Sequence, residues 1–469
     1  MASNPLAPGW LAAPPDANAL APSLWSRTVA RSGGELVVGG VGARELAERY
    51  GTPLYVVDEA DARARAVEVR SAFQDAFDAV GGTATVYYAG KAFLSVEVAR
   101  WMAGAGLNID VCSGGELAVA LAAGVEPARL GFHGNNKSVA EIDRAVSSGV
   151  GTIIIDSFQE IERVAAAASR HGVRQRVRLR VNSGVHAHTH AFLATAHEDQ
   201  KFGIGLADAV AAVERIRSHG GLEFVGLHCH IGSQIFGADG FAESASRLLD
   251  VHAELLAGGD VPELNLGGGF GIAYTVADDP SPIEALAERI AQTVAAGCAE
   301  RGIPLPAVAF EPGRSIIGTA GLTLYTVGTT KDVEVAYQDD GETAVRRYVS
   351  VDGGMSDNAR PALYGADYSV RLANRVSDAV PALVRIAGKH CESGDIVVDA
   401  DYLPGDVTPG DLVAVPATGA YCWSLASNYN YLGRPPVVAV RDGRSRVIVR
   451  GETVEDLLAR DAAYEGVTG

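Results

Sequence analysis

The 469-residue chain is poor in lysine and in basic side chains generally. Only five of its 39 basic residues are lysines, 57 residues are acidic, and the formal net charge is −18. Nucleic acids and anionic membrane surfaces are bound by clustered Lys and Arg, so this balance argues against both kinds of partner. Because lysine is scarce, each one is more informative than usual; they are Lys91, Lys137, Lys201, Lys331 and Lys389.

Paired cysteines and long apolar runs are also missing. The five cysteines are odd in number and form no C-x-x-C pair, which disfavours a disulfide framework and a zinc knuckle and fits a reducing compartment. No run of 18 apolar residues occurs, so a membrane-spanning helix is excluded. The first 25 residues lack the basic start and apolar run of a secretory signal. We therefore expect a cytoplasmic protein.

What is present between about residues 52 and 315 is a regular alternation of β-rich runs and Ala/Glu/Arg-rich helical segments. Strands alternating with helices predict βαβ units and a parallel sheet. Eight or nine such units fit a (β/α)8 TIM-type barrel better than an open doubly wound sheet, which usually stops at about five to seven strands. There are nine candidate strands for eight positions, and we take PLYVV (residues 53–57) as the strand that leads into the barrel.

After about residue 316 the helical period disappears, and short strands alternate with Gly, Pro and Asp turns. This pattern predicts a C-terminal all-β domain resembling a sandwich or barrel. We expect a poorly ordered extension over residues 1–25, strands over 26–48 that join the β domain, the barrel over 49–315 and the β domain over 316–469.

Active-site residues of a parallel barrel lie at the carboxyl ends of its strands. Lys91 follows the run ATVYYAG, where partial desolvation would favour the neutral amine that forms a Schiff base. The alternative is a surface lysine just past a strand. Asp110 ends the run LNID in the same way.

Two further strand ends suggest anion and ring binding. The glycines of NLGGGFG, which include Gly268 and Gly269, let backbone N–H groups approach a phosphate closely, although a tight βα turn is the alternative. In FEPGRS, Glu311 is suited to a ring nitrogen, and Gly313 with Arg314 to an anion. An Arg–Glu ion pair that closes the barrel is the alternative there.

Two His-x-His patterns leave a rival open. HAHTH (residues 186–190) and HCH (residues 228–230) could each offer two imidazoles on one strand face, as in barrel hydrolases with a metal-bound water. Lys91 and Asp110 could complete such a site. HAHTH is followed by a Thr/Asp/Gln-rich loop rather than a helix, so we favour hydrogen-bonding or stacking roles and expect no metal.

A strand-end lysine, a glycine run, a carboxylate for a ring nitrogen and a histidine that can stack are together the parts of a pyridoxal phosphate site. The chain resembles the barrel-type pyridoxal phosphate decarboxylases of alanine-racemase-like fold over about residues 35–435. The matching stretches include YYAGKAF, DVCSGGEL, GFHGNNKS, GLHCHIGSQI, LNLGGGFGI and FEPGRSII. SDNARPALYGADY, HAHTH and CESGD resemble the diaminopimelate decarboxylase branch in particular, whereas the other features are shared with ornithine and arginine decarboxylases.

The resemblance implies pyridoxal 5'-phosphate as the cofactor, bound covalently through Lys91. Glu311 would pair with its ring nitrogen, and His230 would stack on its ring. The implied cofactor-binding set is Lys91, Asp110, His230, Ser233, Gly268, Gly269, Glu311, Gly313, Arg314 and Tyr421.

The resemblance also implies the substrate contacts and the assembly. The substrate would be meso-diaminopimelate, decarboxylated to L-lysine in the last step of lysine biosynthesis, and its contacts would be Arg314, Arg360, Tyr364, Glu392 and Tyr421. Cys391 would protonate the reacting carbon, since a thiol is mostly protonated near neutral pH yet can give up its proton. In this family CESGD reaches the active site of the other subunit, which implies a homodimer with shared sites. Ornithine, lysine or arginine is the alternative substrate, and a metal-dependent barrel hydrolase or a non-catalytic cofactor-binding homologue is the alternative function.

Overall fold

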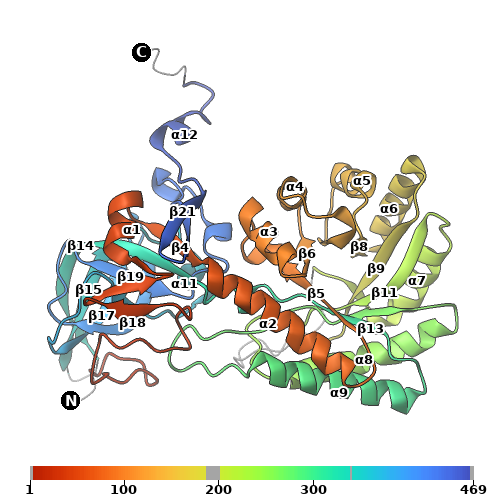
Figure 1. The fold of residues 1–469 in the computed structure, drawn as a ribbon, viewed down its shortest axis with the longest axis horizontal. Helices are drawn as coiled ribbons and strands as arrows, with labels where there is room; N and C mark the ends of the chain where they lie inside the picture. Colours follow the sequence, from red (N-terminus) through yellow and green to blue (C-terminus); the bar gives the residue numbers. More distant parts are fainter. Residues whose placement is uncertain (1–3, 186–200, 338–340, 465–469) are drawn as a thin grey trace. The chain divides into compact units, whose positions relative to one another are not determined.

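The structure is a computed structural model that describes residues 4–185, 201–337 and 341–464 (Figure 1). The chain forms two units. The barrel unit comprises Arg63–Ile272 and Pro280–Ile316, and the β unit comprises Met1–Ala62, Ala273–Asp279 and Ile317–Gly469. The domain boundaries expected from the sequence stay predictions.

The barrel unit contains a closed ring of eight parallel strands, which confirms the predicted TIM-type barrel. Around the ring the order is β9, β11, β12, β13, β5, β6, β7 and β8, and β8 pairs with β9 to close it. Strands β5 to β8 have the bounds Ala84–Ala89, Asn108–Val111, Leu130–Phe132 and Thr152–Ile155. Strands β9, β11, β12 and β13 have the bounds Gln175–Asn182, Leu222–His228, Glu263–Asn265 and Ala307–Phe310. β10 (Ile204–Gly205) adds to β9 outside the ring.

Helices cover the outside of these strands (Figure 1). Their bounds are α2 Glu59–Asp78, α3 Val96–Gly104, α4 Gly114–Ala122, α5 Val139–Ser148, α6 Phe158–His171, α7 Ala209–Arg217, α8 Asp239–Leu256 and α9 Ile283–Arg301. Serine side chains cap the amino ends of α3, α4, α5 and α6, and left-handed glycines end α5, α6 and α9. These caps satisfy backbone groups that a helix end leaves open, so the sequence itself helps to set these helix ends.

The ninth candidate strand, β4 (Leu54–Asp58), is not part of the barrel ring. It runs antiparallel to β14 (Gly321–Ala336) and parallel to β20 (Val437–Arg441) in the sheet of the β unit. The other eight candidates supply the eight barrel strands. Residue count and pattern alone therefore gave one strand too many.

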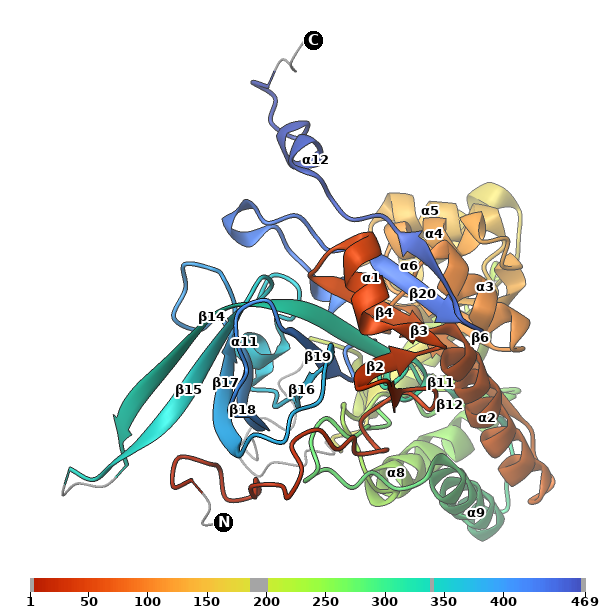
Figure 2. The ribbon, with the colours of Figure 1, turned by 60° about the vertical axis from the view of Figure 1, so that its left-hand side comes forward.

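The β unit is built on a sheet with the order β18, β17, β15, β14, β4, β20, β21, and β19 pairs with β14 and β16. The long antiparallel pair of β14 and β15 is prominent in Figure 2. The remaining bounds are β15 Thr343–Val351, β16 Arg371–Leu372, β17 Pro381–Ala387, β18 Ile396–Pro404, β19 Leu412–Pro416 and β21 Arg444–Val449. Helices α1 (Ala43–Tyr50), α11 (Arg360–Tyr364) and α12 (Val454–Leu458) are short.

The amino-terminal part of the chain packs on the β unit. Strands β1 (Ala30–Ser32), β2 (Glu35–Val38) and β3 (Val41–Gly42) form a small sheet, and Leu36 shares a buried cluster with Leu324. Further upstream, Leu11 is buried against Leu383 and Tyr402. Among the described residues, no helix is long and apolar enough to cross a membrane.

Candidate active site

A cavity of about 450 Å³ lies among the residues that end or follow the barrel strands. Four of the predicted site residues line it: Lys91, Asp110, His230 and Glu311. Lys91 is exposed in the turn Gly90–Ala92 after β5, Asp110 is in β6, and Glu311 directly follows β13. The barrel therefore brings together groups that are up to 220 residues apart in the sequence, at the end of the barrel where catalytic residues are expected.

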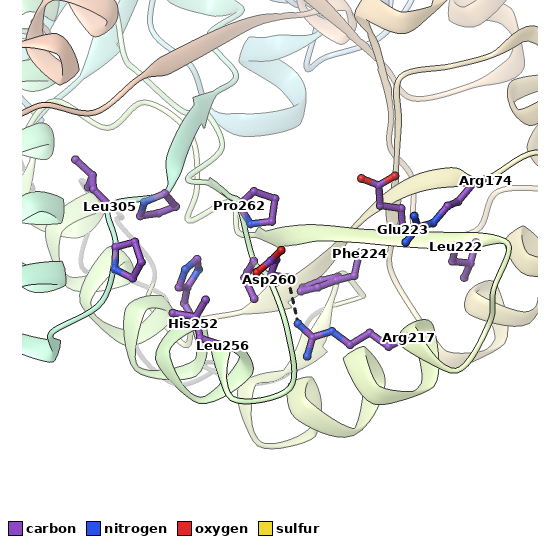
Figure 3. A pocket seen from close by; sticks show the side chains of 13 residues that line it. Arg174, Arg217, Leu222, Glu223, Phe224, His252, Leu256, Asp260, Pro262 and Leu305 are labelled. Atoms are coloured by element: carbon purple, nitrogen blue, oxygen red, sulfur yellow. Dashed lines mark hydrogen bonds between the residues drawn. The ribbon is translucent and has the colours of Figure 1, made fainter.

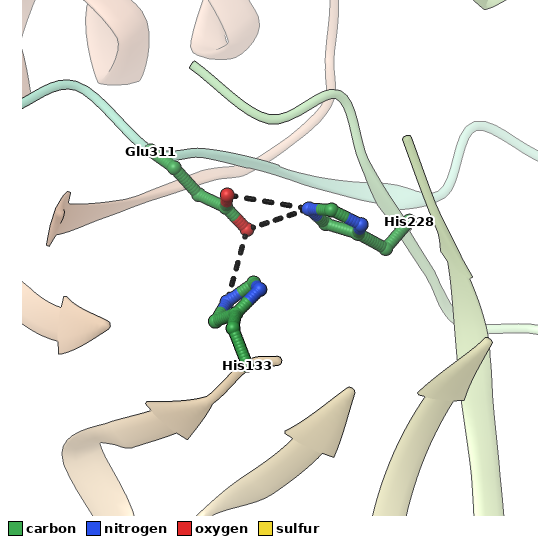
Figure 4. Close-up of side chains that lie close together, drawn as sticks. All are labelled: His133, His228 and Glu311. Carbon is green, nitrogen blue, oxygen red and sulfur yellow. Dashed lines mark hydrogen bonds and ion pairs between the residues drawn. The ribbon is translucent and has the colours of Figure 1, made fainter. Parts of the chain in front are cut away.

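Glu311 is held by Asn265 and by the two histidines drawn with it in Figure 4. Its Oε1 accepts a 2.7 Å hydrogen bond from Asn265 Nδ2 and lies 3.1 Å from His228 Nε2 and 3.4 Å from His133 Nε2. We assign the His228 proton to Nε2 because a carboxylate can only accept. Burial lowers the pKa of both His133 and His228 to about 4, so both rings are neutral at physiological pH.

The two carboxyl groups in this network have opposite protonation tendencies. Burial, reinforced by the charge of Glu311, raises the pKa of Asp110 well above its usual value. Burial acts in the same direction on Glu311, but the ring of His228, which is hydrogen-bonded to its carboxylate, and the nearby ring of His133 hold its pKa well below its usual value. Since two close buried carboxylates cannot both ionise cheaply, Asp110 holds the proton and Glu311 carries the charge.

Within the described parts of the chain, the cluster that could hold a metal ion consists of His133, His228 and Glu311. Ligand atoms of His133, His228 and Glu311 all lie within 4.8 Å of one another. The HCH motif contributes only His228 to it, because His230 Nδ1 is the acceptor for Gly268 N–H at 3.3 Å. HAHTH lies outside the described residues. The geometry thus does not use the His-x-His pairing on which the hydrolase alternative depends.

The glycines after β12 form a backbone cradle. A Cβ atom on Gly268 would lie 2.1 Å from the Glu311 carbonyl oxygen, and one on Gly269 would lie 2.4 Å from that of Gly232. Gly269 also has φ +112°, a conformation that disfavours any side chain. Next to Gly232, Ser233 Oγ accepts a 2.9 Å hydrogen bond from Arg314 Nη2. The cradle therefore combines open backbone, a hydroxyl and a guanidinium, which suits an anion.

The predicted residues Arg360, Tyr364 and Tyr421 belong to the β unit. Arg360 is buried at the start of α11, donates to Tyr368 Oη at 2.5 Å and lies 4.3 Å above the Tyr274 ring. Tyr364, at the end of the same helix, is 66% exposed. Tyr421 lies in a turn with φ +59°.

Cys391 and Glu392 lie in an exposed loop between β17 and β18. Cys391 N–H donates to Asn430 Oδ1 at 3.0 Å, and Glu392 accepts hydrogen bonds from Gly394 N–H and Ser393 Oγ, of which the first lowers its pKa most. Beside them, His390 is buried and its ring stacks on Tyr429 with centroids 5.6 Å apart. The loop is thus held by its neighbours while its thiol and carboxylate stay at the surface.

Several cavity-lining residues were missed by the sequence analysis; they are Cys112, His133, Asn135, Arg180 and Phe202. His133 ends the run RLGFH and Cys112 follows LNIDV, so the strand-end rule that found Lys91 could have found both. Phe202 gave no such signal, since it reaches the cavity through tertiary packing.

A larger cavity, about 650 Å³, lies at the opposite end of the barrel (Figure 3). Its lining includes Arg217, Phe224 and His252, and none of the predicted site residues. Arg217 donates to the carbonyl oxygens of Leu255 and Gly259 and lies 5.5 Å from the Phe224 ring centre, so its guanidinium is already engaged in holding this end of the fold together.

Comparison with known proteins gives a consistent result. A family model described as "Pyridoxal-dependent decarboxylase, pyridoxal binding domain" matches residues 66–318. The diaminopimelate decarboxylase of Mycobacterium tuberculosis is 51% identical over 449 residues, which cover 94% of this chain and 98% of that protein. The enzyme of the same name from Bacillus subtilis is 44% identical, covering 92% and 96%. The crystal structure of diaminopimelate decarboxylase from M. jannaschii in complex with L-lysine superposes with a TM-score of 0.85 at 32% identity, covering 93% and 98%.

Proposed function

The chain belongs to the diaminopimelate decarboxylase family of pyridoxal-dependent decarboxylases, and from this premise we propose that it converts meso-2,6-diaminopimelate to L-lysine and carbon dioxide. The observation that carries the proposal is the barrel-mouth cavity, in which Lys91 and Glu311 face one space beside the glycine cradle. Over 90% of the chain aligns with relatives that bear this name. Formation of lysine would make it the last step of lysine biosynthesis.

The residues present fit pyridoxal 5'-phosphate. Within the described chain Asp110 Oδ2 and His228 Nδ1 have no hydrogen-bond partner, whereas Asp110 Oδ1 lies 3.1 Å from His133 Nε2. Ser233 and Arg314, which are hydrogen-bonded to each other, offer a hydroxyl and a guanidinium that suit a phosphate. We propose that Lys91, Glu311 and His230 would hold the cofactor: the Lys91 amine would condense with its aldehyde and release water, Glu311 would pair with its ring nitrogen, and His230 would stack on its ring. The phosphate would be held by Ser233, Gly268, Gly269, Gly313 and Arg314, with Asp110 and Tyr421 completing the site.

When bound, this cofactor supplies an electron sink for the electron pair that the departing carboxyl group leaves behind. The part of the protein is to keep that sink effective. An ionised Glu311, anchored by Asn265 and His228, can hold a proton on the ring nitrogen. Asp110 can keep its own proton and avoid placing a second negative charge beside Glu311.

The two ends of the substrate need different partners. We propose that Arg314, Arg360 and Tyr364 contact substrate carboxylate, because a guanidinium offers a planar pair of donors, and that Glu392 pairs with the distal ammonium. Cys391 would then deliver the proton from Sγ to the carbon that lost its carboxyl group. A substrate without the distal charged groups would leave these partners unpaired, which is a strong basis for rejection.

We further propose a homodimer in which the loop of residues 389–395 serves the barrel cavity of the other subunit. The exposed Cys391 and Glu392 support this, as do the exposed rings of Tyr429 and Tyr431 beside them. All five cysteines are free, which suits the reducing cytoplasm that we propose as the location.

The test is carbon dioxide release from meso-diaminopimelate, ornithine, lysine and arginine by the purified protein, with metal content measured in parallel. We expect turnover of meso-diaminopimelate alone and a cofactor trapped on Lys91 by borohydride, located by peptide mass spectrometry. Preference for ornithine would overturn the substrate assignment. A stoichiometric metal without trapped cofactor would overturn the reaction class in favour of the hydrolase.

A further inference from the structure

A buried ion pair lies behind one wall of the barrel-mouth cavity. Lys137, in the loop between β7 and α5, contacts both oxygens of Glu160 with Nζ at 3.0 and 2.9 Å. Its Nζ also donates to the carbonyl oxygens of Gly134 and Ile154, both at 2.7 Å. The side chains of the pair are only 1% and 3% exposed. The ammonium group is therefore fully satisfied, and it joins the β7 loop, the end of β8 and the first turn of α6.

The pair is continued by further hydrogen bonds toward a third loop. Glu160 Oε2 accepts from Asp156 N–H at 2.8 Å, and Asp156 Oδ1 accepts from Gly203 N–H at 2.8 Å. Phe202, next in sequence to Gly203, lies under the Arg180 guanidinium with 4.2 Å between the carbon centre and the ring centre. A continuous set of polar contacts thus runs from Gly134 to Phe202.

Both ends of this set reach the cavity, whereas its centre does not. Gly134, Asn135 and Phe202, called the loop wall below, line the cavity together with Arg180, and neither Lys137 nor Glu160 does. Burying two charges is costly, and an apolar pair of similar volume is often at least as stable. An ion pair supplies directional hydrogen bonds that an apolar pair lacks. Here the Lys137 ammonium holds the carbonyl oxygens of Gly134 and Ile154 in fixed positions.

We propose that Lys137 and Glu160 are positioning residues for the pyridoxal phosphate site, and that their ion pair holds the loop wall in the shape that the cofactor requires. The inference rests on the proposed function for the identity of the cofactor. It predicts that loss of the pair loosens the loop wall and weakens cofactor binding, although neither side chain touches the cavity.

The test compares the double variant Lys137→Met/Glu160→Gln with a matched control. The double variant leaves no unpaired charge buried, so it folds even where Lys137→Met alone does not. The control is Gln175→Leu at the other end of β9, which removes buried hydrogen bonds to the carbonyl oxygens of Val150 and Arg176. For each purified protein the dissociation constant of pyridoxal phosphate is measured by equilibrium dialysis, and kcat and KM at saturating cofactor.

We expect the dissociation constant to rise about tenfold or more in the double variant, since small displacements of a binding wall have effects of this size, and to stay within about twofold of wild type in the control. At saturating cofactor, KM should change more than kcat. An unchanged dissociation constant in the double variant, or an equal rise in the control, would overturn the proposal. Failure of the wild-type protein to bind the cofactor would instead refute the proposed function.

Discussion

The two units differ in how several of their candidate site residues are packed. In the barrel unit, Glu311, Asp110 and His228 are packed into one hydrogen-bonded and charge-coupled network around a cavity. In the β unit, Cys391, Glu392 and Tyr364 are exposed. A preorganised network suits the binding of a rigid cofactor, and an exposed loop suits a group that is delivered to another surface. The difference leads us to expect that barrel residues govern cofactor binding and β-unit residues govern turnover.

Lys91→Ala tests the role of the barrel unit in cofactor binding and is expected to have the largest effect. Loss of the amine removes the covalent attachment, so activity should fall at least about a thousandfold, and borohydride should trap no cofactor on the protein. The measurement is carbon dioxide release together with intact-protein mass. Lys331→Ala, at an exposed position in β14, is the control and should keep both properties.

Cys391→Ala tests the role of the β unit in turnover. Loss of a general acid costs about a hundredfold in kcat, while the cofactor dissociation constant should stay at the wild-type value because the barrel network is intact. Steady-state kinetics and dialysis check the two quantities. Cys298→Ala, at a buried free cysteine in α9 that does not line the cavity, serves as the control. Full activity of Cys391→Ala would remove this residue from the mechanism.

Arg360→Lys would sharpen the comparison within the β unit. The change keeps the charge but loses the planar guanidinium that stacks on Tyr274 and bonds Tyr368. We expect KM for meso-diaminopimelate to rise about tenfold with cofactor affinity unchanged. Arg385→Lys, in β17, is the control. Weakened cofactor binding in Arg360→Lys would contradict the division of labour between the units.

The smallest effect concerns acid stability and contrasts two buried histidines. His390 of the β unit contacts Asp395 through Nδ1 at 2.8 Å, whereas Nδ1 of the equally buried His252 in α8 has no partner in the described chain. Burial lowers the pKa of His252 to about 4, from an ordinary value of 6.5. Between these two values the unfolded chain binds a proton that the fold excludes, so stability is complete above about pH 6.5 and falls as the pH drops toward 4.

Between pH 7.5 and pH 5.5, the free energy of unfolding should therefore fall by about 1 kcal/mol less in His252→Leu than in wild type. Urea denaturation at the two pH values measures it. The control is His219→Leu, which replaces a partly exposed histidine beside Glu162. If both variants lose stability in acid as steeply as wild type, His252 is not a source of the acid sensitivity.

The sequence was sufficient for the barrel and for much of its mouth because both depend on local pattern. The strand-end rule found Lys91, Asp110 and Glu311, since each directly ends or follows a β-rich run. Pairing between distant segments is not encoded in that way. β4 has the apolar pattern of a barrel strand, yet its partners are β14 and β20.

Contacts made by one side chain across several loops were beyond prediction for the same reason. Lys137 and Glu160 are 23 residues apart, and Tyr274 and Arg360 are 86 apart. No periodicity links the members of either pair. Only the folded loops show that Lys137 reaches three elements, and only the folded β unit shows that Arg360 lies against an aromatic ring.

The glycine cradle has a consequence for the spectrum of tolerated mutations. Every missense change at position 268 adds a Cβ atom, and that atom would press on the carbonyl oxygen of Glu311 itself. The damage would therefore be transmitted to Glu311 as well as to the cradle itself. In a saturation screen, substitutions at position 268 should therefore produce defects like those at position 311, which would reveal a contact that the order of residues along the chain conceals.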